Sequence, residues 1–378
     1  MVIPALLLAL QAVRAGPTQS VDAVVQDGIR TGVYPGAVAV IGTSQRILLA
    51  RGYGHFTWSG SSAVPDPDST LFDLASLTKV VATLPSVMVL VQDGRVRLDD
   101  PVQTYLPEFR GDGKERVSVR NLLEHRSGLR AFLPLNERAK TAEEARRLVM
   151  EEPLRWPPGQ RVVYSDLNAM LLGWIVERVT GERLDAFATR AVFAPIGMHE
   201  TRYLPPRSER RRVMPVGLWH GHAIAGEIHD QNAARLGGVS GHAGLYSTGA
   251  DLARYARMWL DGGRLSDGRQ LFHEGLVAAF RRRGPGNRAL GWEMRDTSAT
   301  ENTGHRLSAA TFGHTGYTGT SIWIDPERGV FVILLTNRVF APRVSRPITR
   351  LKEIRGRLAD AAVALFEQAC RGNSAEQC

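Results

Sequence analysis

The stretch Leu71-Phe-Asp-Leu-Ala-Ser-Leu-Thr-Lys79 is the most informative part of the sequence for the choice of fold. It places a serine three residues before a lysine at the expected start of a helix. Residues three apart share one helical face, so the amine of Lys79 can reach the hydroxyl of Ser76. A serine needs such a neighbour to act as a nucleophile at neutral pH. The apolar run that follows predicts a buried helix, in which an unpaired lysine is costly. The alternative is a helix-capping serine with a lysine that reaches solvent.

A second group of polar residues follows the turn Trp156-Pro-Pro-Gly-Gln160 and consists of Tyr164, Asp166 and Asn168. A tyrosine beside an ammonium group loses its proton more easily and can transfer protons. Tyr164 is therefore a candidate acid–base group. Taken alone, the pattern is more typical of a buried tyrosine beside a helix-capping aspartate.

The third group is Gly313-His-Thr-Gly-Tyr-Thr-Gly-Thr-Ser321, which leads into a predicted strand. Dense glycines let a backbone approach a ligand closely. The N–H groups of Ser76 and Tyr317 can together form an oxyanion hole. The alternative is a glycine-rich edge strand or a bulge.

These three groups, in this order and context, resemble the penicillin-recognising serine hydrolases. The resemblance is closest to the class C β-lactamase branch, with its D-alanyl-D-alanine peptidase and family VIII esterase relatives. It covers roughly residues 20–370. Further matches are Leu122-Leu-Glu-His-Arg-Ser-Gly-Leu129, Gly244-Leu-Tyr-Ser-Thr-Gly-Ala-Asp-Leu252 and Gly226-Glu-Ile-His-Asp-Gln-Asn-Ala233, the last typical of a penicillin-binding-protein-4B-like subgroup.

The resemblance implies an α+β fold of the β-lactamase/transpeptidase type, with an active site between a sheet and a helical domain. It implies that Ser76 is the nucleophile and that Lys79 and Tyr164 transfer protons. Five further residues are expected to contact the substrate: Asp166, Asn168, His314, Thr315 and Gly316. His314 takes the place that a lysine often holds in this motif.

One position departs from the family pattern, which usually reads Tyr-x-Asn where this chain has Tyr164-Ser-Asp166. A carboxylate accepts hydrogen bonds but cannot donate one to a substrate carbonyl. Asp166 is also expected to keep Lys79 charged, which makes Tyr164 the better base for the Ser76 proton. Efficient β-lactam hydrolysis is therefore doubtful, and Asn168 is a candidate for the missing donor.

Strand patterns occur at both ends of the chain and helical patterns between them. Strands are expected at 34–41 and 46–50, and a hairpin at 320–336. One antiparallel sheet of about five strands, built from both ends and packed by helices, is the economical arrangement. We expect residues 16–75 and 301–378 to form the sheet portion and residues 76–300 an inserted, mainly helical portion. Together they make one catalytic domain at about 18–370.

The resemblance implies a small-molecule or peptidoglycan-type substrate, and the composition does not favour nucleic acid as a partner. The net charge is +9, but the arginines are scattered without interleaved aromatic residues. The histidines at 220, 222 and 229 with Asp230 include metal-ligand residue types, yet their spacing matches no zinc motif. No metal, no cofactor and no integral membrane span is expected, and the oligomeric state stays open.

The first fifteen residues, with the apolar run Ala5-Leu-Leu-Leu-Ala-Leu10, predict a secretory signal, although a basic n-region is missing. Export to the periplasm or the medium is therefore expected; a buried N-terminal helix in a cytoplasmic protein is the alternative. The only cysteines are Cys370 and Cys378, which can form a small disulfide loop after export or remain as two thiols.

The sequence thus predicts a serine hydrolase that forms an acyl-enzyme at Ser76 and cleaves an ester or amide. Candidate substrates are D-Ala-D-Ala-type peptides, small esters and, weakly, β-lactams. The alternative is a slowly acylating penicillin sensor or cell-wall-binding protein with little turnover.

Overall fold

The computed structural model describes residues 17–371. The expected signal segment and Cys378, one of the two cysteines that can form a disulfide, lie outside the described residues.

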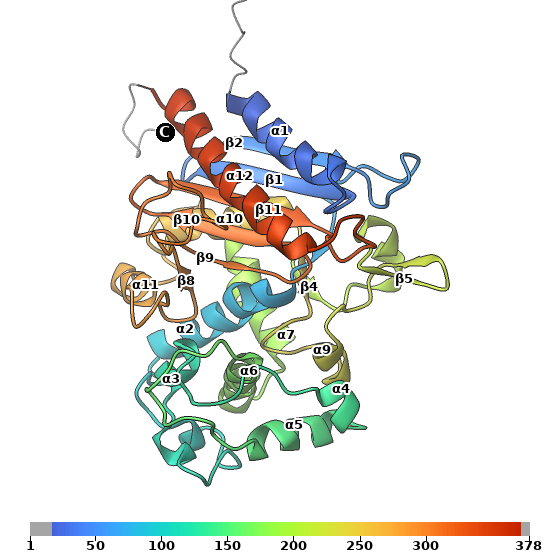
Figure 1. The fold of residues 1–378 in the computed structure, drawn as a ribbon. Coiled ribbons are helices and arrows are strands. Elements are labelled where there is room, and N and C mark those ends of the chain that lie inside the picture. The colour runs from blue at the N-terminus through green and yellow to red at the C-terminus, as the bar shows by residue number, and fades with distance from the viewer. Residues whose placement is uncertain (1–16, 372–378) are drawn as a thin grey trace, which may run out of the picture.

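The core of the fold is a six-stranded antiparallel sheet built from both ends of the chain, in the order β2-β1-β11-β10-β9-β8. This confirms the predicted α+β class, with one strand more than the five expected (Figure 1). The strands are β1 (Gly36–Thr43), β2 (Ile47–Gly54), β8 (Glu293–Met294), β9 (Phe312–Thr315), β10 (Ser321–Asp325) and β11 (Val330–Thr336).

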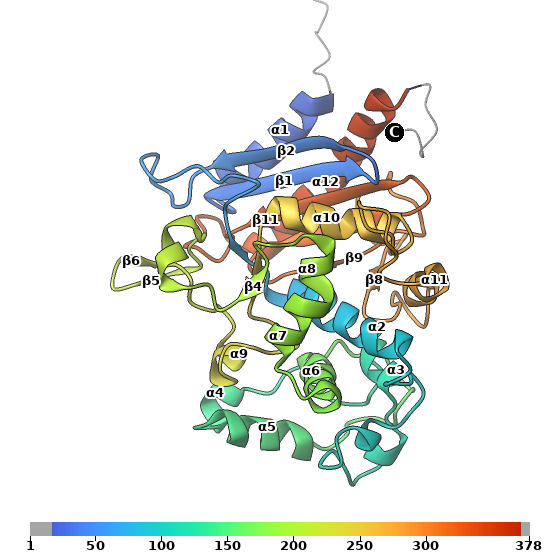
Figure 2. The same ribbon diagram turned by 180° about the vertical axis from the view of Figure 1, so that it is seen from behind.

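Helices cover both faces of this sheet. The first and last helices, α1 (Pro17–Arg30) and α12 (Pro347–Ala369), lie side by side on one face, and α10 (Gly249–Leu260) lies on the other (Figures 1 and 2). Alternate residues of β1 serve the two faces: Ala39 belongs to the core under α1 and α12, and Val40 to the core under α10. This period of two is the pattern that a strand buried on both faces requires.

The crossing of α10 over β1 depends on a glycine. A Cβ at Gly249 would lie 2.9 Å from the nearest side-chain carbons of Val38 and Val40, so only glycine lets the helix lie this close to the strand. Thr248 begins the helix, because its hydroxyl accepts a hydrogen bond from the backbone N–H of Asp251 at 3.2 Å.

The segment expected to be mainly helical forms the lower half of the molecule in Figure 1 and also contributes α10 and β8 to the sheet layers. Its other helices are α2 (Leu84–Gln92), α3 (Val119–Leu123), α4 (Leu135–Arg138), α5 (Ala142–Glu151), α6 (Asp166–Thr180), α7 (Leu184–Ala188), α8 (Ala194–Ile196), α9 (Gln231–Arg235) and α11 (Glu274–Arg281). The segment also contributes to two small sheets. One joins β7 (Leu245–Ser247) and β4 (Arg202–Tyr203) to β3 (Phe72–Asp73), which precedes the segment, and the other consists of β5 (Gly217–Trp219) and β6 (His222–Ile224).

One helical run, Ala75–Gln92, is long and apolar enough to cross a membrane by length and composition alone. In the structure 78% of that run is buried inside the protein. It is the central helix of the core between the sheet and the helical portion, as its apolar character on all sides requires.

Candidate active site

The proposed nucleophile lies in a strained turn between β3 and the central helix. Ser76 is part of a short 3₁₀ turn, Ala75–Leu77, and a π-helical turn, Lys79–Thr83, follows before α2 begins. Ala75 has a φ of 47°, which is unusual for a residue with a side chain. Such backbone strain gathers at functional sites, where the surrounding structure holds it. The sequence predicted a regular helix here and did not reveal this turn.

Lys79 is the centre of the site and is almost completely buried. Its Nζ donates to Ser76 Oγ at 3.0 Å and to the backbone oxygen of His242 at 3.0 Å. It also forms an ion pair with Asp166 Oδ1 at 2.8 Å. Burial alone would lower the pKa of Lys79, but the Asp166 carboxylate and the Tyr164 hydroxyl outweigh it and raise that pKa above its ordinary value. Lys79 is therefore an ammonium at neutral pH.

The Tyr164 ring lies among cations and histidines. Lys79 Nζ is 5.1 Å from the ring centroid and the Arg288 guanidinium is 5.3 Å from it. The rings of His125 and His314 lie 4.7 and 5.7 Å away. Tyr164 therefore lies within reach of Lys79 at the cavity wall, in a position from which it can exchange a proton with Ser76 or the substrate.

Both histidines beside Tyr164 are neutral. Burial first, and then the charges of Arg288 and Lys79, hold the pKa of His314 and that of His125 well below the ordinary value. His314 Nδ1 lies 2.9 Å from the backbone oxygen of Thr315, which can only accept, so Nδ1 carries the proton. The buried Nε2 of His314 has no hydrogen-bond partner among the described residues and is a free acceptor at the cavity wall.

The expectation that Asn168 contacts the substrate is wrong. Its side chain is fully buried, and its amide oxygen accepts from Ser127 Oγ at 2.6 Å. Its amide nitrogen lies 3.2 Å from His125 Nδ1, which also accepts from the backbone N–H of Ser165. Asn168 therefore positions His125 under Tyr164 and cannot replace the donor that Asp166 lacks.

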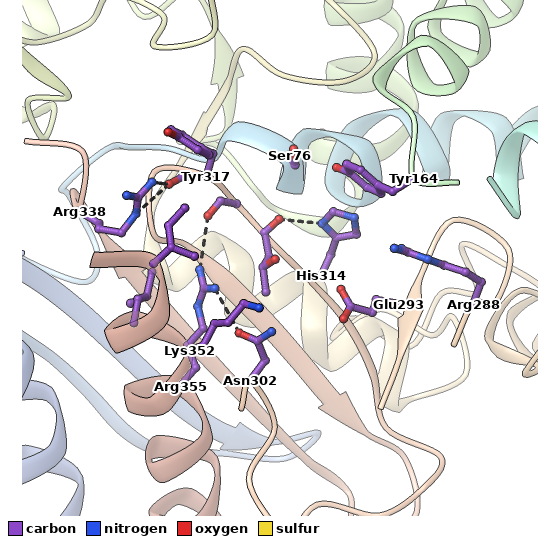
Figure 3. A pocket seen from close by; sticks show the side chains of 14 residues that line it. Ser76, Tyr164, Arg288, Glu293, Asn302, His314, Tyr317, Arg338, Lys352 and Arg355 are labelled. Atoms are coloured by element: carbon purple, nitrogen blue, oxygen red, sulfur yellow. Dashed lines mark hydrogen bonds between the residues drawn. The ribbon is translucent and has the colours of Figure 1, made fainter. Parts of the chain in front are cut away.

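A cavity of about 310 Å³ opens in front of these groups (Figure 3). Ser76, Tyr164 and the segment from His314 to Tyr317 line it, whereas Lys79 and Asp166 do not. Six more polar residues line the same cavity, and the sequence patterns did not identify them: Arg288, Glu293, Asn302, Arg338, Lys352 and Arg355. Four of these six are cations and one is a carboxylate, so the cavity suits an anionic group.

Asp230, in the segment with the histidines at 220, 222 and 229, makes local hydrogen bonds in the structure. The described residues hold no group of three or more His, Cys, Asp or Glu side chains arranged to bind a metal ion. Asp230 instead accepts from the backbone N–H of Ala233 at 2.8 Å and lies 3.1 Å from His242 Nε2.

Gly316 is a position where a single methyl group should disable the site. A Cβ there would lie 2.5 Å from the backbone oxygen of Leu74 and would also meet Thr320 Oγ1. We expect Gly316→Ala to push Tyr317 away from Ser76 and to lower kcat/KM for a p-nitrophenyl ester about 100-fold. Steady-state kinetics on folded protein measure this, and wild-type kcat/KM in the variant would contradict it.

Asp166→Asn removes the charge that keeps Lys79 an ammonium and supplies an amide donor. Because Asp166 raises the pKa of Lys79, its loss lowers that pKa, and the pH at which Lys79 becomes a free amine moves down. The stabilisation from the pair is complete below the ordinary lysine pKa, about 10.4, and is lost only as the pH rises through the higher folded-state value.

We therefore expect Asp166→Asn to have a lower Tm at pH 7 and a measurable gain in nitrocefin turnover at pH 8–9, of roughly tenfold or more. A pH series of nitrocefin kcat/KM for both proteins tests this. Unchanged turnover with an unchanged pH profile would show that neither the charge nor the missing donor limits the reaction.

Comparison with known proteins identifies the family. The β-lactamase family model matches residues 21–354. A putative D-alanyl-D-alanine carboxypeptidase of Salmonella agona (strain SL483) is 31% identical over 358 residues, covering 85% of this chain and 82% of the relative.

Solved structures agree on the fold. A penicillin-binding protein homologue from Caulobacter crescentus has a TM-score of 0.74 at 22% identity, covering 94% of this chain and 99% of its own. EstCE1, described as a hydrolase with promiscuous acyltransferase activity, has a TM-score of 0.72 at 20% identity, covering 90% and 98%. The comparisons confirm the family part of the sequence-based resemblance: this chain belongs to the β-lactamase family.

Proposed function

We propose that this protein is a serine hydrolase that forms an acyl-enzyme at Ser76. The observation that carries the proposal is the 3.0 Å contact between Lys79 Nζ and Ser76 Oγ at the wall of a cavity. A cation this close stabilises the alkoxide character that the serine oxygen gains as it attacks a carbonyl. The oxygen bonds to the carbonyl carbon, and the leaving group departs with a proton.

In this proposal Tyr164 handles the proton. A lysine held as an ammonium donates hydrogen bonds but has no lone pair with which to accept a proton. Tyr164 lies against Lys79 at the cavity wall, and its hydroxyl is one of the groups that raise the pKa of that lysine. Its oxygen accepts the Ser76 proton as its own hydroxyl proton passes to the leaving group, so Tyr164 has the same number of protons before and after the step.

The oxyanion would be held by the backbone N–H groups of Ser76 and Tyr317. Both residues line the cavity, and Figure 3 shows them on adjacent parts of its wall. Arg338 fixes the Tyr317 peptide from behind: its guanidinium donates to the Tyr317 backbone oxygen and lies 4.7 Å from the ring centroid. Preorganised donors of this kind stabilise the charge that develops in acyl transfer.

For the substrate, we propose a peptide with a free C-terminal carboxylate, of the D-Ala-D-Ala type. The relative from Salmonella agona carries the name of such a carboxypeptidase. The cationic wall of the cavity supports the same choice, because Arg338, Lys352 and Arg355 can attract a carboxylate. A neutral ester could react with Ser76 but would make no ion pair with these three cations.

Two matched peptides test the substrate. We expect D-alanine release from an acyl-D-Ala-D-Ala peptide with a kcat/KM at least about tenfold above that for the same peptide with a C-terminal amide. Equal rates for the two peptides would reject the carboxylate site. Release from neither peptide, with p-nitrophenyl esters still cleaved, would make the protein an esterase.

One observation favours a second candidate, a slowly acylating binding protein. Because Asp166 keeps Lys79 charged, no free amine is at hand to activate the deacylating water. A stoichiometric burst of p-nitrophenol without steady-state release would establish this candidate in place of the hydrolase.

A further inference from the structure

Asp73 is a buried carboxylate beside the site whose charge the mechanism above does not use. It is 3% exposed, and no cation lowers its pKa; burial raises that pKa to about 6 against the opposing effect of two backbone N–H donors. It does not line the cavity. Burying such a group without a cation is unfavourable unless its oxygens have hydrogen-bond donors.

The first carboxylate oxygen of Asp73 accepts a hydrogen bond from the turn that contains Ser76. Asp73 Oδ1 accepts from the backbone N–H of Ala75 at 2.8 Å. Ala75 is the residue with φ of 47° that directly precedes Ser76, so this bond holds the strained residue that sets the direction of the Ser76 N–H.

The second carboxylate oxygen of Asp73 accepts a hydrogen bond from the segment that contains His229. Asp73 Oδ2 accepts from the backbone N–H of His229 at 3.0 Å. The ring of His229 lies 5.5 Å from the ring of Tyr317, centroid to centroid. Tyr317 belongs to the connection between β9 and β10. The next residue of this connection, Thr318, also contacts Asp73, because its Oγ1 donates to the Asp73 backbone oxygen at 2.7 Å.

We propose that Asp73 is a positioning residue that sets the two oxyanion donors relative to each other, with one oxygen on the Ser76 turn and the other on the His229 segment that supports Tyr317. The proposal rests on the proposed function, since the two N–H groups matter only if an acyl-transfer oxyanion forms between them. It also gives a role to the Gly226–Ala233 motif, which presents the His229 N–H to Asp73 and whose Asp230 caps the start of α9.

Asp73→Asn tests the proposal with the least change in shape. An amide has one accepting oxygen, so one of the two backbone N–H groups would face an NH₂ instead. We expect kcat for p-nitrophenyl butyrate to fall roughly 10- to 100-fold, because small misplacements of catalytic groups have effects of this size. KM should stay within about threefold, because ground-state binding does not use the oxyanion donors.

Asp325→Asn is the matched control for simple loss of stability. Asp325 is also fully buried and accepts backbone N–H groups, from Ser308 at 2.7 Å and Glu327 at 3.1 Å, but it holds the β10–β11 turn outside the cavity lining. We expect it to lower Tm while leaving kcat unchanged. Adding Ala75→Gly to the Asp73→Asn variant should restore part of the lost kcat, since glycine adopts a positive φ freely.

Wild-type kcat in Asp73→Asn, or an equal kcat loss in Asp325→Asn at an equal loss of Tm, would overturn the inference. Failure of the proposed function looks different, because wild-type protein would then show no covalent labelling of Ser76 at all. If wild type is labelled and Asp73→Asn is labelled equally fast by a fluorophosphonate, only the positioning role is wrong.

Discussion

Ser76→Ala is expected to lower kcat for a p-nitrophenyl ester by about 10⁴-fold or more, the largest effect of any substitution in the chain. The variant has no oxygen to form the acyl-enzyme, and the remaining groups can only assist direct attack by water. Ser76 is only partly exposed, and its Oγ accepts a hydrogen bond from Lys79 Nζ at 3.0 Å. Its removal should therefore leave the fold intact.

Two further measurements distinguish a loss of chemistry in Ser76→Ala from unfolding or weaker substrate binding. The Tm of Ser76→Ala should lie close to that of the wild type, which shows that the loss is chemical. The KM for the residual activity should change far less than kcat, because the cavity wall that binds the substrate is untouched. Residual activity above about one hundredth of the wild type would place the nucleophile elsewhere.

Lys79→Met is expected to have the second-largest effect, a loss of kcat of about 10²- to 10⁴-fold. The variant keeps an unbranched apolar side chain of similar length but removes the ammonium beside Ser76. It also leaves Asp166, which is partly buried, without its cation. Breaking such a pair is destabilising, so the experiment needs a control that suffers a comparable loss of stability.

Lys114→Met is that control. Lys114 is as deeply buried as Lys79; its Nζ donates to the Met150 backbone oxygen at 2.7 Å and lies 5.2 Å from the Phe109 ring centroid. It lies in the helical portion and does not line the cavity. We expect this variant to lose Tm and to keep kcat within about threefold of the wild type. Equal kcat losses in both lysine variants would mean that Lys79 has only a structural role.

Much of the fold follows from patterns that are local in sequence. The predicted strand at 34–41 corresponds to β1, and the predicted hairpin at 320–336 to β10 and β11, because alternating and continuous apolar runs mark buried strands. The strand β8 was missed, since two residues carry no periodicity. The π-helical turn after Ser76 was missed because helical spacing alone does not distinguish it from a regular helix.

Site residues could be predicted from the sequence only where their spacing along the chain brings their side chains together. Ser76 and Lys79 are three residues apart, so helix geometry brings them together. Arg288, Arg338 and Arg355 reach the cavity from separate elements, and nothing in an arginine-rich chain marks these three. Asn168 had the right spacing from Tyr164, but the side-chain direction on α6 turns it into the core.

Intact-mass spectrometry after incubation with a fluorophosphonate probe shows whether Ser76 is an activated nucleophile. We expect a mass increase of one probe adduct per chain, with the adduct mapped by peptide sequencing to Ser76 and absent from Ser76→Ala. No mass increase in folded wild-type protein, or an adduct on a different side chain, would contradict it.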